Sequence, residues 1–322
     1  MKDGITVIIP FLNEESGIEA FCRAFDEYAG TVSFPIEAIF VNDGSTDASP
    51  AIVRGFTFHN IIRSRLINFS RNFGSHAGYR AGIAHASFDI CTWVAADLQD
   101  PFELIDISYE KIKNDEADAV YVGRSKYEVP FFTKLFSHMY STLMQKYAVP
   151  KYEPGGYQTI VFNRKIIDYL NDNMEANSSI LLQIVNAGFR SEVIHLDFTE
   201  RKAGRSKWSL SKKIKLAIDS FVAFSFMPIR LVSIVGVIMF IAGALYGVWV
   251  IINKFISTTV VSGYSTIACL LALGFGVTNI SLGVIAEYLW RAYDASMKRP
   301  VYIISDITEL TTEGGKSGSE GQ

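Results

Sequence analysis

Short apolar runs, each ending in a polar cluster, alternate with helical patterns through the first 125 residues of the chain. The apolar runs are ITVIIP, IEAIFVND, RLINFS, ICTWVAA and ADAVYVG, at residues 5–10, 36–43, 65–70, 90–96 and 117–123. Because Val and Ile fill these runs without polar alternation, they indicate strands that are covered on both faces. Their alternation with helices predicts an α/β fold with a doubly wound, mostly parallel sheet.

The segments between these runs carry helix signals. Ser16 is placed to cap a first helix, and Asp47 to start a second. The small-residue segment at residues 74–87 predicts a helix that packs closely. Pro101 fits the first position of a fourth helix, with Asp100 as its N-cap. The first helix carries Ile18, Phe21, Cys22 and Phe25.

Polar clusters follow the predicted strands at the point where each strand ends. They read PFLNEE, NDGSTD, SRNFG, ADLQD and GRSK, at residues 10–15, 42–47, 70–74, 96–100 and 123–126. In open α/β sheets, ligands bind outside the carboxyl ends of the strands. The five clusters therefore predict one site at one edge of the sheet.

The acids in these clusters suit a nucleotide and a divalent cation. Asp43, Asp97 and Gln99 offer oxygen ligands, and magnesium typically takes one or two carboxylates and completes its shell with phosphate oxygens and water. The chain has no GxxxxGKS sequence, so it is not a P-loop protein, and no GxGxxG that opens a helix.

Composition excludes several other classes. A formal net charge of −3 argues against a nucleic-acid partner. The three cysteines lie far apart, which argues against a disulfide framework and fits a reducing compartment. The five histidines show no metal-ligand spacing.

Two uncharged stretches near the C-terminus predict a membrane hairpin. Residues 231–252 carry no charge and are long enough to cross a bilayer, and residues 262–286 form a second, less apolar stretch. Basic residues precede the first stretch and follow the second, whereas the loop between them holds only Lys254. The positive-inside rule therefore predicts a multi-pass protein of the inner (plasma) membrane with both termini in the cytoplasm.

Several motifs together resemble one family. VIIPFLNEE, FVNDGSTD, RNFG, ADLQDP, VGRSK, RKAGRSKWS and AEYLWRAYDASMKRPVYII are similar to family 2 glycosyltransferases of the GT-A fold. Within it, the sequence resembles the polyprenyl-phosphate glycosyltransferases, which include dolichyl-phosphate mannose synthase and bactoprenol glucosyltransferases. The resemblance implies transfer of a sugar from a nucleotide sugar, with UDP as the expected nucleotide. The implied acceptor is a polyprenyl phosphate such as undecaprenyl phosphate, at the cytoplasmic face and with anomeric inversion.

The resemblance also implies roles for particular residues. Asp97 and Gln99 fall on the family's motif for Mg²⁺ or Mn²⁺, and Arg124 falls near the diphosphate. The positions that match its nucleoside site are Pro10, Leu12, Asn13, Glu14, Asn42 and Asp43. The positions in its phosphate-closing loop are Arg201, Arg205, Ser206 and Lys207. Asp97, Arg124, Arg201 and Lys207 are the expected catalytic residues. Residues 201–207 also suit a basic patch attracted to anionic lipid.

The implied organisation has four parts. Residues 1–208 form a cytoplasmic GT-A domain, and residues 209–228 an amphipathic juxtamembrane helix. Residues 229–290 form the two-helix hairpin, and residues 291–322 a cytoplasmic C-terminal tail. A second amphipathic segment, at residues 131–148, suits either the membrane interface or core packing.

The sequence departs from the family pattern at three positions. Ala95 and Asn42 replace the first acids of the usual DADLQD and DDGS motifs, and Gln158 stands where the family has an acid. A phosphate monoester has a second pKa near 6 and needs no general base, so the loss at Gln158 is compatible with catalysis. Ala95 predicts weaker metal binding in the absence of donor.

Two alternative functions are compatible with the sequence, and so is a homo-oligomer. One alternative is a processive polysaccharide synthase, although the QxxRW motif of that class is absent. The other is a non-catalytic nucleotide-sugar-binding membrane protein, suggested by Ala95 and Gln158. The GxxxG pattern at residues 243–247 suits either a homo-oligomer or contact between the two spans of one chain.

Overall fold

The structure is a computed structural model that describes residues 2–125, 131–149, 152, 156–174, 179–198, 225, 227–256, 263–297 and 299–313. The chain divides into two compact units. The first comprises residues 1–216 and 300–322, and the second comprises residues 217–299.

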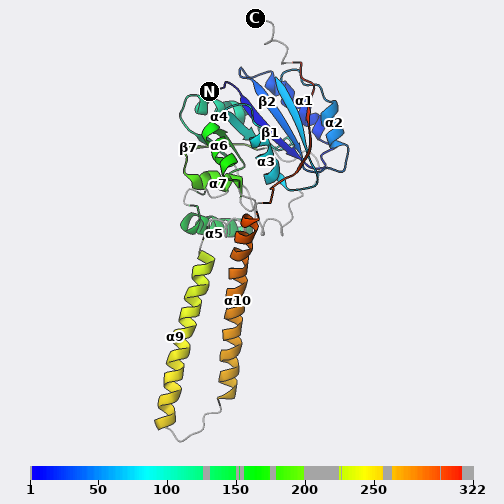
Figure 1. The fold of residues 1–322 in the computed structure, drawn as a ribbon. Coiled ribbons are helices and arrows are strands. Elements are labelled where there is room, and N and C mark those ends of the chain that lie inside the picture. Colours follow the sequence, from blue (N-terminus) through cyan, green and yellow to red (C-terminus); the bar gives the residue numbers. More distant parts are fainter. Residues whose placement is uncertain are drawn as a thin grey trace. The chain divides into compact units, whose positions relative to one another are not determined.

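The first unit is built on an eight-stranded sheet in the order β7-β5-β6-β4-β1-β2-β3-β8 (Figure 1). Its strands are β1 (Ile5–Phe11), β2 (Ile36–Asn42), β3 (Arg63–Phe69), β4 (Ile90–Trp93), β5 (Ala119–Arg124), β6 (Thr159–Asn163), β7 (Ser191–Leu196) and β8 (Ile304–Glu309). β1 pairs in parallel with β2 and β4, β2 with β3, and β5 with β7. β6 and β8 run antiparallel to their neighbours. The carboxyl ends of β1 to β5 therefore share one edge, as the sequence predicts.

Helices cover both faces of this sheet. Within the described residues, the helices of the first unit are α1 (Ile18–Ala29), α2 (Ser49–Gly55), α3 (Ser75–Ala84), α4 (Glu103–Lys113), α5 (Phe131–Tyr147), α6 (Arg164–Asp172) and α7 (Ile180–Ala187). On one face, Val7 and Ile9 join a core with Phe21 of α1 and Leu104 of α4. On the other face, a Cβ added to Gly82 of α3 would overlap the side chain of Ile8. The doubly wound arrangement and the closely packed small-residue helix are thus confirmed.

Two predicted helix caps are wrong. The N-cap of α1 is Gly17 without a side-chain cap, because Glu14 O already accepts from the N–H groups of Gly17 and Ile18. α4 begins at Glu103 with Phe102 as its N-cap, so neither Asp100 nor Pro101 has the predicted place. The carboxylate of Asp100 turns back into its own loop instead.

The C-terminal segment is not a tail over its described length. Residues up to Ser296 belong to a long helix, and residues 304–309 form β8, which pairs with β3. Leu310 is buried in the core of the first unit, and Tyr302 stacks on Phe69 at 5.3 Å between ring centroids. The sequence of β8 lacks an apolar pattern because the strand lies at the edge of the sheet, where its side chains are half-buried or exposed.

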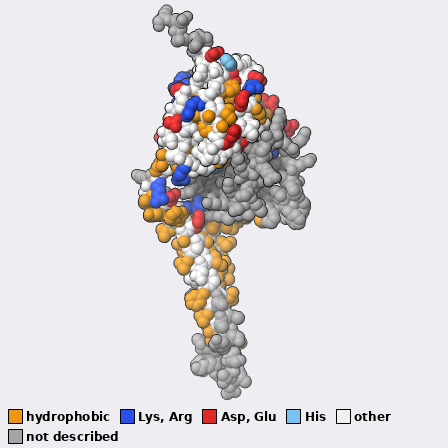
Figure 2. Space-filling view, turned by 90° about the vertical axis from the view of Figure 1, so that its right-hand side faces the viewer, with side chains coloured by type: hydrophobic (Ala, Val, Ile, Leu, Met, Phe, Trp, Pro, Cys, Tyr) orange, Lys and Arg blue, Asp and Glu red, His pale blue; other side chains and the backbone are white. Residues whose placement is uncertain are grey.

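The second unit contains α9 (Met227–Ile256) and α10 (Tyr264–Ser296), which pack against each other. Within the described residues, Met227–Trp249 is the helix that is long and apolar enough to cross a membrane. α10 contains most of the second predicted stretch and exposes large apolar side chains such as Leu273, Phe275 and Leu289. Figure 2 shows hydrophobic side chains along the described surface of this unit. The juxtamembrane helix predicted at residues 209–228 lies largely outside the described residues.

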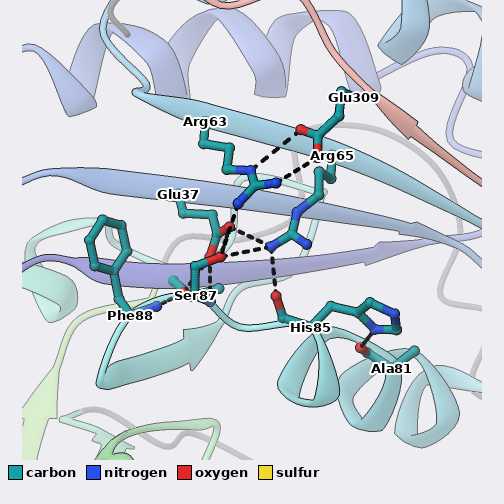
Figure 3. A network of polar contacts seen from close by, with 9 residues as sticks. Glu37, Arg63, Arg65, Ala81, His85, Ser87, Phe88 and Glu309 are labelled. Atoms are coloured by element: carbon teal, nitrogen blue, oxygen red, sulfur yellow. Dashed lines mark hydrogen bonds and ion pairs between the residues drawn. The ribbon is translucent and has the colours of Figure 1, made fainter. Parts of the chain in front are cut away.

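A polar network lies near the amino ends of β1, β2 and β3, away from the edge that carries the clusters (Figure 3). Glu37 of β2 has a fully buried side chain and forms an ion pair with Arg65 of β3 at 2.5 Å. Thr6 Oγ1 and Ser87 Oγ also donate to Glu37, each at 2.7 Å. Burial acts to raise the pKa of Glu37, but these hydrogen bonds and the Arg65 charge outweigh it and hold that pKa below its usual value. Arg63, beside this network, forms an exposed ion pair with Glu309 of β8.

Candidate functional site

The loop after β1 is joined to the loop after β2 by hydrogen bonds. Asn13 adopts a positive φ of 51°, which Asn tolerates better than most residues. Its N–H donates to Ser45 Oγ at 2.9 Å, and its side-chain Oδ1 accepts from the N–H of Thr46 at 2.8 Å. The N–H of Glu14 donates to Ser49 Oγ at 2.8 Å. Pro10 and Leu12 are half-buried at the end of the same strand.

Asn42 and Gly44 shape the second loop. Asn42 is buried, and its Oδ1 accepts from the N–H of Ser45 at 2.8 Å. Its Nδ2 donates to Asn68 Oδ1 at 2.9 Å. Gly44 has a φ of +73°, and a Cβ there would lie 2.6 Å from the Arg71 carbonyl carbon, so both conformation and space require glycine.

The carboxylate of Asp43 holds the loop that precedes α3. Its Oδ1 accepts from the N–H of Phe73 at 2.6 Å, and its Oδ2 from the N–H of Gly74 at 2.9 Å. Burial raises the pKa of Asp43, although these two hydrogen bonds act in the opposite direction. Asp43 therefore fixes the backbone of the RNFG segment from within the predicted nucleoside site.

The ADLQD segment forms a tight turn after β4. Asp97 and Gln99 are half-buried, and the N–H of Gln99 donates to Asp97 Oδ1 at 3.2 Å. Leu98 between them has a positive φ of 59°. The turn thus places the Asp97 carboxylate and the Gln99 side chain two residues apart at the end of a central strand.

Asp100 closes this turn. Its Oδ2 accepts from the N–H of Ala95 at 2.7 Å, which links the two ends of the segment. Burial raises the pKa of Asp100 to about 6, and the charge of Asp97 acts in the same direction. The Asp100 carboxylate thus accepts a hydrogen bond from the backbone of Ala95, the position at which the related motif has its first acid.

Arg124 and Gln158 lie at the same edge of the sheet. Arg124 ends β5, and its guanidinium stands over the ring of Phe198 at 5.2 Å. Its charge acts to lower the pKa of the nearby Asp100. Gln158 is exposed just before β6, and its N–H donates to Val122 O at 2.9 Å. The predicted loop residues Arg201, Arg205, Ser206 and Lys207 lie outside the described residues.

The ADLQD turn suits a hard divalent cation. A carboxylate and an amide provide oxygen ligands of the kind that Mg²⁺ and Mn²⁺ take. No group of three or more His, Cys, Asp or Glu side chains suited to a metal occurs within the described residues. Asp97 and Gln99 are the residues of this turn that would hold a cation.

The fold and the candidate site together indicate a class of protein. A mostly parallel α/β sheet gathers two acids, an arginine and interlocked polar loops at the carboxyl ends of its central strands, which is where such sheets bind nucleotides.

Comparisons with known proteins place the chain within that class. The family model described as glycosyl transferase family 2 matches residues 6–197. A prophage bactoprenol glucosyl transferase homolog of Escherichia coli K12 is 30% identical over 305 residues, covering 94% of this chain and 99% of that protein. The bactoprenol glucosyl transferase of Shigella phage SfV is 32% identical over 304 residues, covering 94% and 98%. A solved mannosyltransferase of Pyrobaculum calidifontis, in complex with GDP-Man and Mn²⁺, is 16% identical, with a TM-score of 0.45 and coverage of 91% and 88%.

The chain belongs to glycosyl transferase family 2, and it is a glycosyltransferase. Its site also contains residues that sequence reasoning missed. Ser45 and Ser49 join the first two loops, and Asn68 supports Asn42. Asn68 could have been found as a polar residue at the end of an apolar strand. Asp306, which contacts Asn68, could not have been found, because 238 residues separate the two.

Proposed function

We propose that this glycosyltransferase moves a sugar from a nucleotide-diphosphate sugar, expected to be UDP-linked, to a polyprenyl phosphate such as undecaprenyl phosphate. The reaction takes place at the cytoplasmic membrane face with inversion at the anomeric carbon. One observation carries the proposal. The match to relatives named bactoprenol glucosyl transferase spans 94% of the chain, so it extends well past the family domain that ends at residue 197. The product would be a lipid-linked sugar for modification of a cell-envelope glycan.

In this proposal the carboxyl edge of the sheet binds the donor. Asp97 and Gln99 hold Mg²⁺ or Mn²⁺, which neutralises charge on the diphosphate leaving group when it is bound. Arg124 adds a fixed positive charge at the same edge. Arg201, Arg205, Ser206 and Lys207 close over the phosphates. The nucleoside site is lined by Pro10, Leu12, Asn13 and Glu14. Asn42 and Asp43 belong to the same site and support its loops by accepting hydrogen bonds from the backbone.

The acceptor chemistry follows from ionisation. A polyprenyl phosphate is already mostly dianionic at neutral pH, because the second pKa of a phosphate monoester is near 6. It can therefore attack without a general base, and Gln158 at the start of β6 is not required to act as one. Gln158→Asn should keep the activity plateau of the parent at alkaline pH.

The membrane part of the proposal rests on α9 and α10. α9 contains the apolar helix Met227–Trp249, and α10 exposes apolar side chains over much of its length. Both helices are proposed to span the membrane as a hairpin with cytoplasmic termini. The GxxxG face at Gly243 and Gly247 is proposed for helix contact in a homo-oligomer, since a Cβ added at either glycine meets no atom within 4 Å among the described residues.

Transfer assays with purified full-length protein in detergent test this function. The donors are UDP-glucose, UDP-N-acetylglucosamine, UDP-galactose and GDP-mannose, each with Mg²⁺ or Mn²⁺, and the products are identified by mass spectrometry. We expect one donor to give a glycosylated undecaprenyl phosphate with the inverted anomeric configuration. Undecaprenol without phosphate is the control acceptor. Equal transfer to undecaprenol, or no transfer from any donor, would contradict the proposal.

A further inference from the structure

A row of four paired residues crosses the sheet at its functional edge. In the strand register, Phe11 of β1 pairs with Asn42 of β2, Asn42 with Asn68 of β3, and Asn68 with Asp306 of β8. The last three side chains form a continuous hydrogen-bonded chain. Asn42 Nδ2 donates to Asn68 Oδ1 at 2.9 Å, and Asn68 Nδ2 donates to Asp306 Oδ2 at 2.9 Å.

These hydrogen bonds continue into the loops after β1 and β2, which are the proposed donor loops. Asn42 Oδ1 accepts from the N–H of Ser45, and Ser45 Oγ accepts from the N–H of Asn13. Asn42 and Asn68 are both buried, with 6% and 7% of their surface exposed, so water cannot readily replace either partner. The hydrogen bonds therefore connect β8 to the loop after β1 across two intervening strands.

The order of donors and acceptors in this series of hydrogen bonds follows from the Asp306 carboxylate. An ionised carboxylate only accepts hydrogen bonds, whereas a side-chain amide has one accepting and one donating end. Asp306 therefore draws the Nδ2 of Asn68, which leaves Asn68 Oδ1 facing Asn42. Asn42 must then present its own Nδ2 to Asn68, and its Oδ1 is left for Ser45.

We propose that Asp306 is a positioning residue for the donor site, because its carboxylate sets the orientation of the Asn68 and Asn42 amides and through them holds Ser45 against Asn13. The inference rests on the proposed donor site and assigns to it a residue from beyond the second unit. It also gives a physical reason for Asn42, where the related motif has an acid. While Asn68 Nδ2 donates to Asp306, its Oδ1 faces position 42, and an acid there would set two accepting oxygens against each other.

The polarity of the chain can be reversed by two isosteric changes. Asn42→Asp places an acceptor against Asn68 Oδ1, and Asn68 cannot flip without turning its oxygen toward the Asp306 carboxylate. Adding Asp306→Asn removes this conflict, because the new amide can donate to the flipped Asn68. Asp306→Asn alone should be mild, since the amide oxygen still accepts from Asn68 Nδ2.

The test measures binding of UDP and of GDP, each with Mg²⁺, to the full-length protein in detergent by calorimetry, together with thermal unfolding. For the nucleotide that the parent binds, we expect Asn42→Asp to weaken binding by roughly tenfold or more. Asp306→Asn should stay within about threefold of the parent, and the double variant should recover to within about threefold. The matched control is Asn42→Asp with Glu309→Gln, which removes a different carboxylate from β8 and should not recover binding.

The outcomes separate this inference from the proposed function. If the parent binds neither nucleotide, the donor-site assignment fails and the positioning role fails with it. If the parent binds a nucleotide but the double variant is no better than Asn42→Asp, only the inference is overturned. Recovery of the unfolding temperature without recovery of binding would mean that the chain of amides supports the fold and does not position the donor loops.

Discussion

At the scale of single residues, neighbouring acids of one turn have different surroundings. Asp97 is half-buried beside Gln99, whereas Asp100 accepts a hydrogen bond from the Ala95 N–H and has a raised pKa. The first carboxylate is therefore the one that we propose to hold a cation, and the second holds the turn.

Asp97→Asn should lower turnover by about a hundredfold or more with little change in unfolding temperature, because a lost transition-state charge contact costs roughly 3 kcal/mol. Asp100→Asn should keep both properties, since its amide oxygen can still accept from Ala95. Ala95→Asp should tighten metal binding without donor. Titration of Mg²⁺ or Mn²⁺ against activity and binding checks all three variants. Full activity with unchanged metal dependence in Asp97→Asn would show that the assignment is wrong.

His76 predicts a pH dependence of stability. Burial, with a smaller effect of the Arg80 charge, lowers the pKa of His76 from 6.5 to about 4, and its buried Nδ1 has no hydrogen-bond partner within the described part of the chain. The unfolded chain therefore binds this proton first as pH falls. The stabilisation is complete above about pH 6.5 and is lost between there and pH 4, by up to about 3 kcal/mol. His76→Gln should flatten this part of the curve of unfolding free energy against pH. A parallel curve for the variant would contradict the prediction.

At the scale of secondary-structure elements, the central strands are joined differently at their two ends. Their carboxyl ends are joined by the neutral amides of Asn42 and Asn68, and their amino ends by the Glu37–Arg65 ion pair (Figure 3). Removing one partner of a buried ion pair leaves the other charge uncompensated.

Glu37→Gln should therefore destabilise the protein by roughly 3 kcal/mol or more and leave nucleotide affinity unchanged, because the pair lies away from the site edge. Thermal unfolding and calorimetry measure the two quantities on the same sample. Replacing both partners, Glu37→Leu with Arg65→Met, should recover part of the loss, since apolar residues of similar volume avoid the buried charge. A marked change in nucleotide affinity in Glu37→Gln would show that the two ends of the sheet are coupled.

At the scale of the whole molecule, the chain leaves its first unit and returns to it. The segment after α10 adds β8 to the sheet and contributes Leu310 to the core of the first unit. Completion of the sheet and core of the first unit therefore requires the residues that follow the second unit in sequence.

The proposed membrane topology is tested by cysteine labelling. Cys22 and Cys91 are buried, so Cys269→Ala gives a suitable background. In intact cells, an impermeant thiol reagent should modify Ser257→Cys, in the loop between the spans, because that loop is expected outside. Ser317→Cys should react only after the membrane is permeabilised. The reverse pattern would overturn the proposed orientation.

The sequence by itself determined the parts of this protein that depend on local pattern. Apolar runs rich in Val and Ile indicated the five strands of the predicted sheet, because strands buried on both faces lack regular polar alternation. The polar residues that end those strands, including Asp43 and Asp97, had to meet at one edge, because parallel strands end on the same side. The uncharged run that contains most of Met227–Trp249 was equally visible, since crossing a bilayer requires only length and apolarity.

Only the tertiary structure decided which partners these residues have. Asp100 precedes a proline and looked like a helix cap, but its carboxylate reaches Ala95 because the turn at Leu98 folds the segment back on itself. The last described strand looked like part of a tail, because an edge strand buries too few side chains to show an apolar pattern. In the sequence, Asn42 stands where the related motif has an acid, and nothing nearby in the sequence explains the change. Its link to Asp306 through Asn68 is visible only in the structure, because side-chain hydrogen bonds across a sheet follow the strand register and not the distance along the chain.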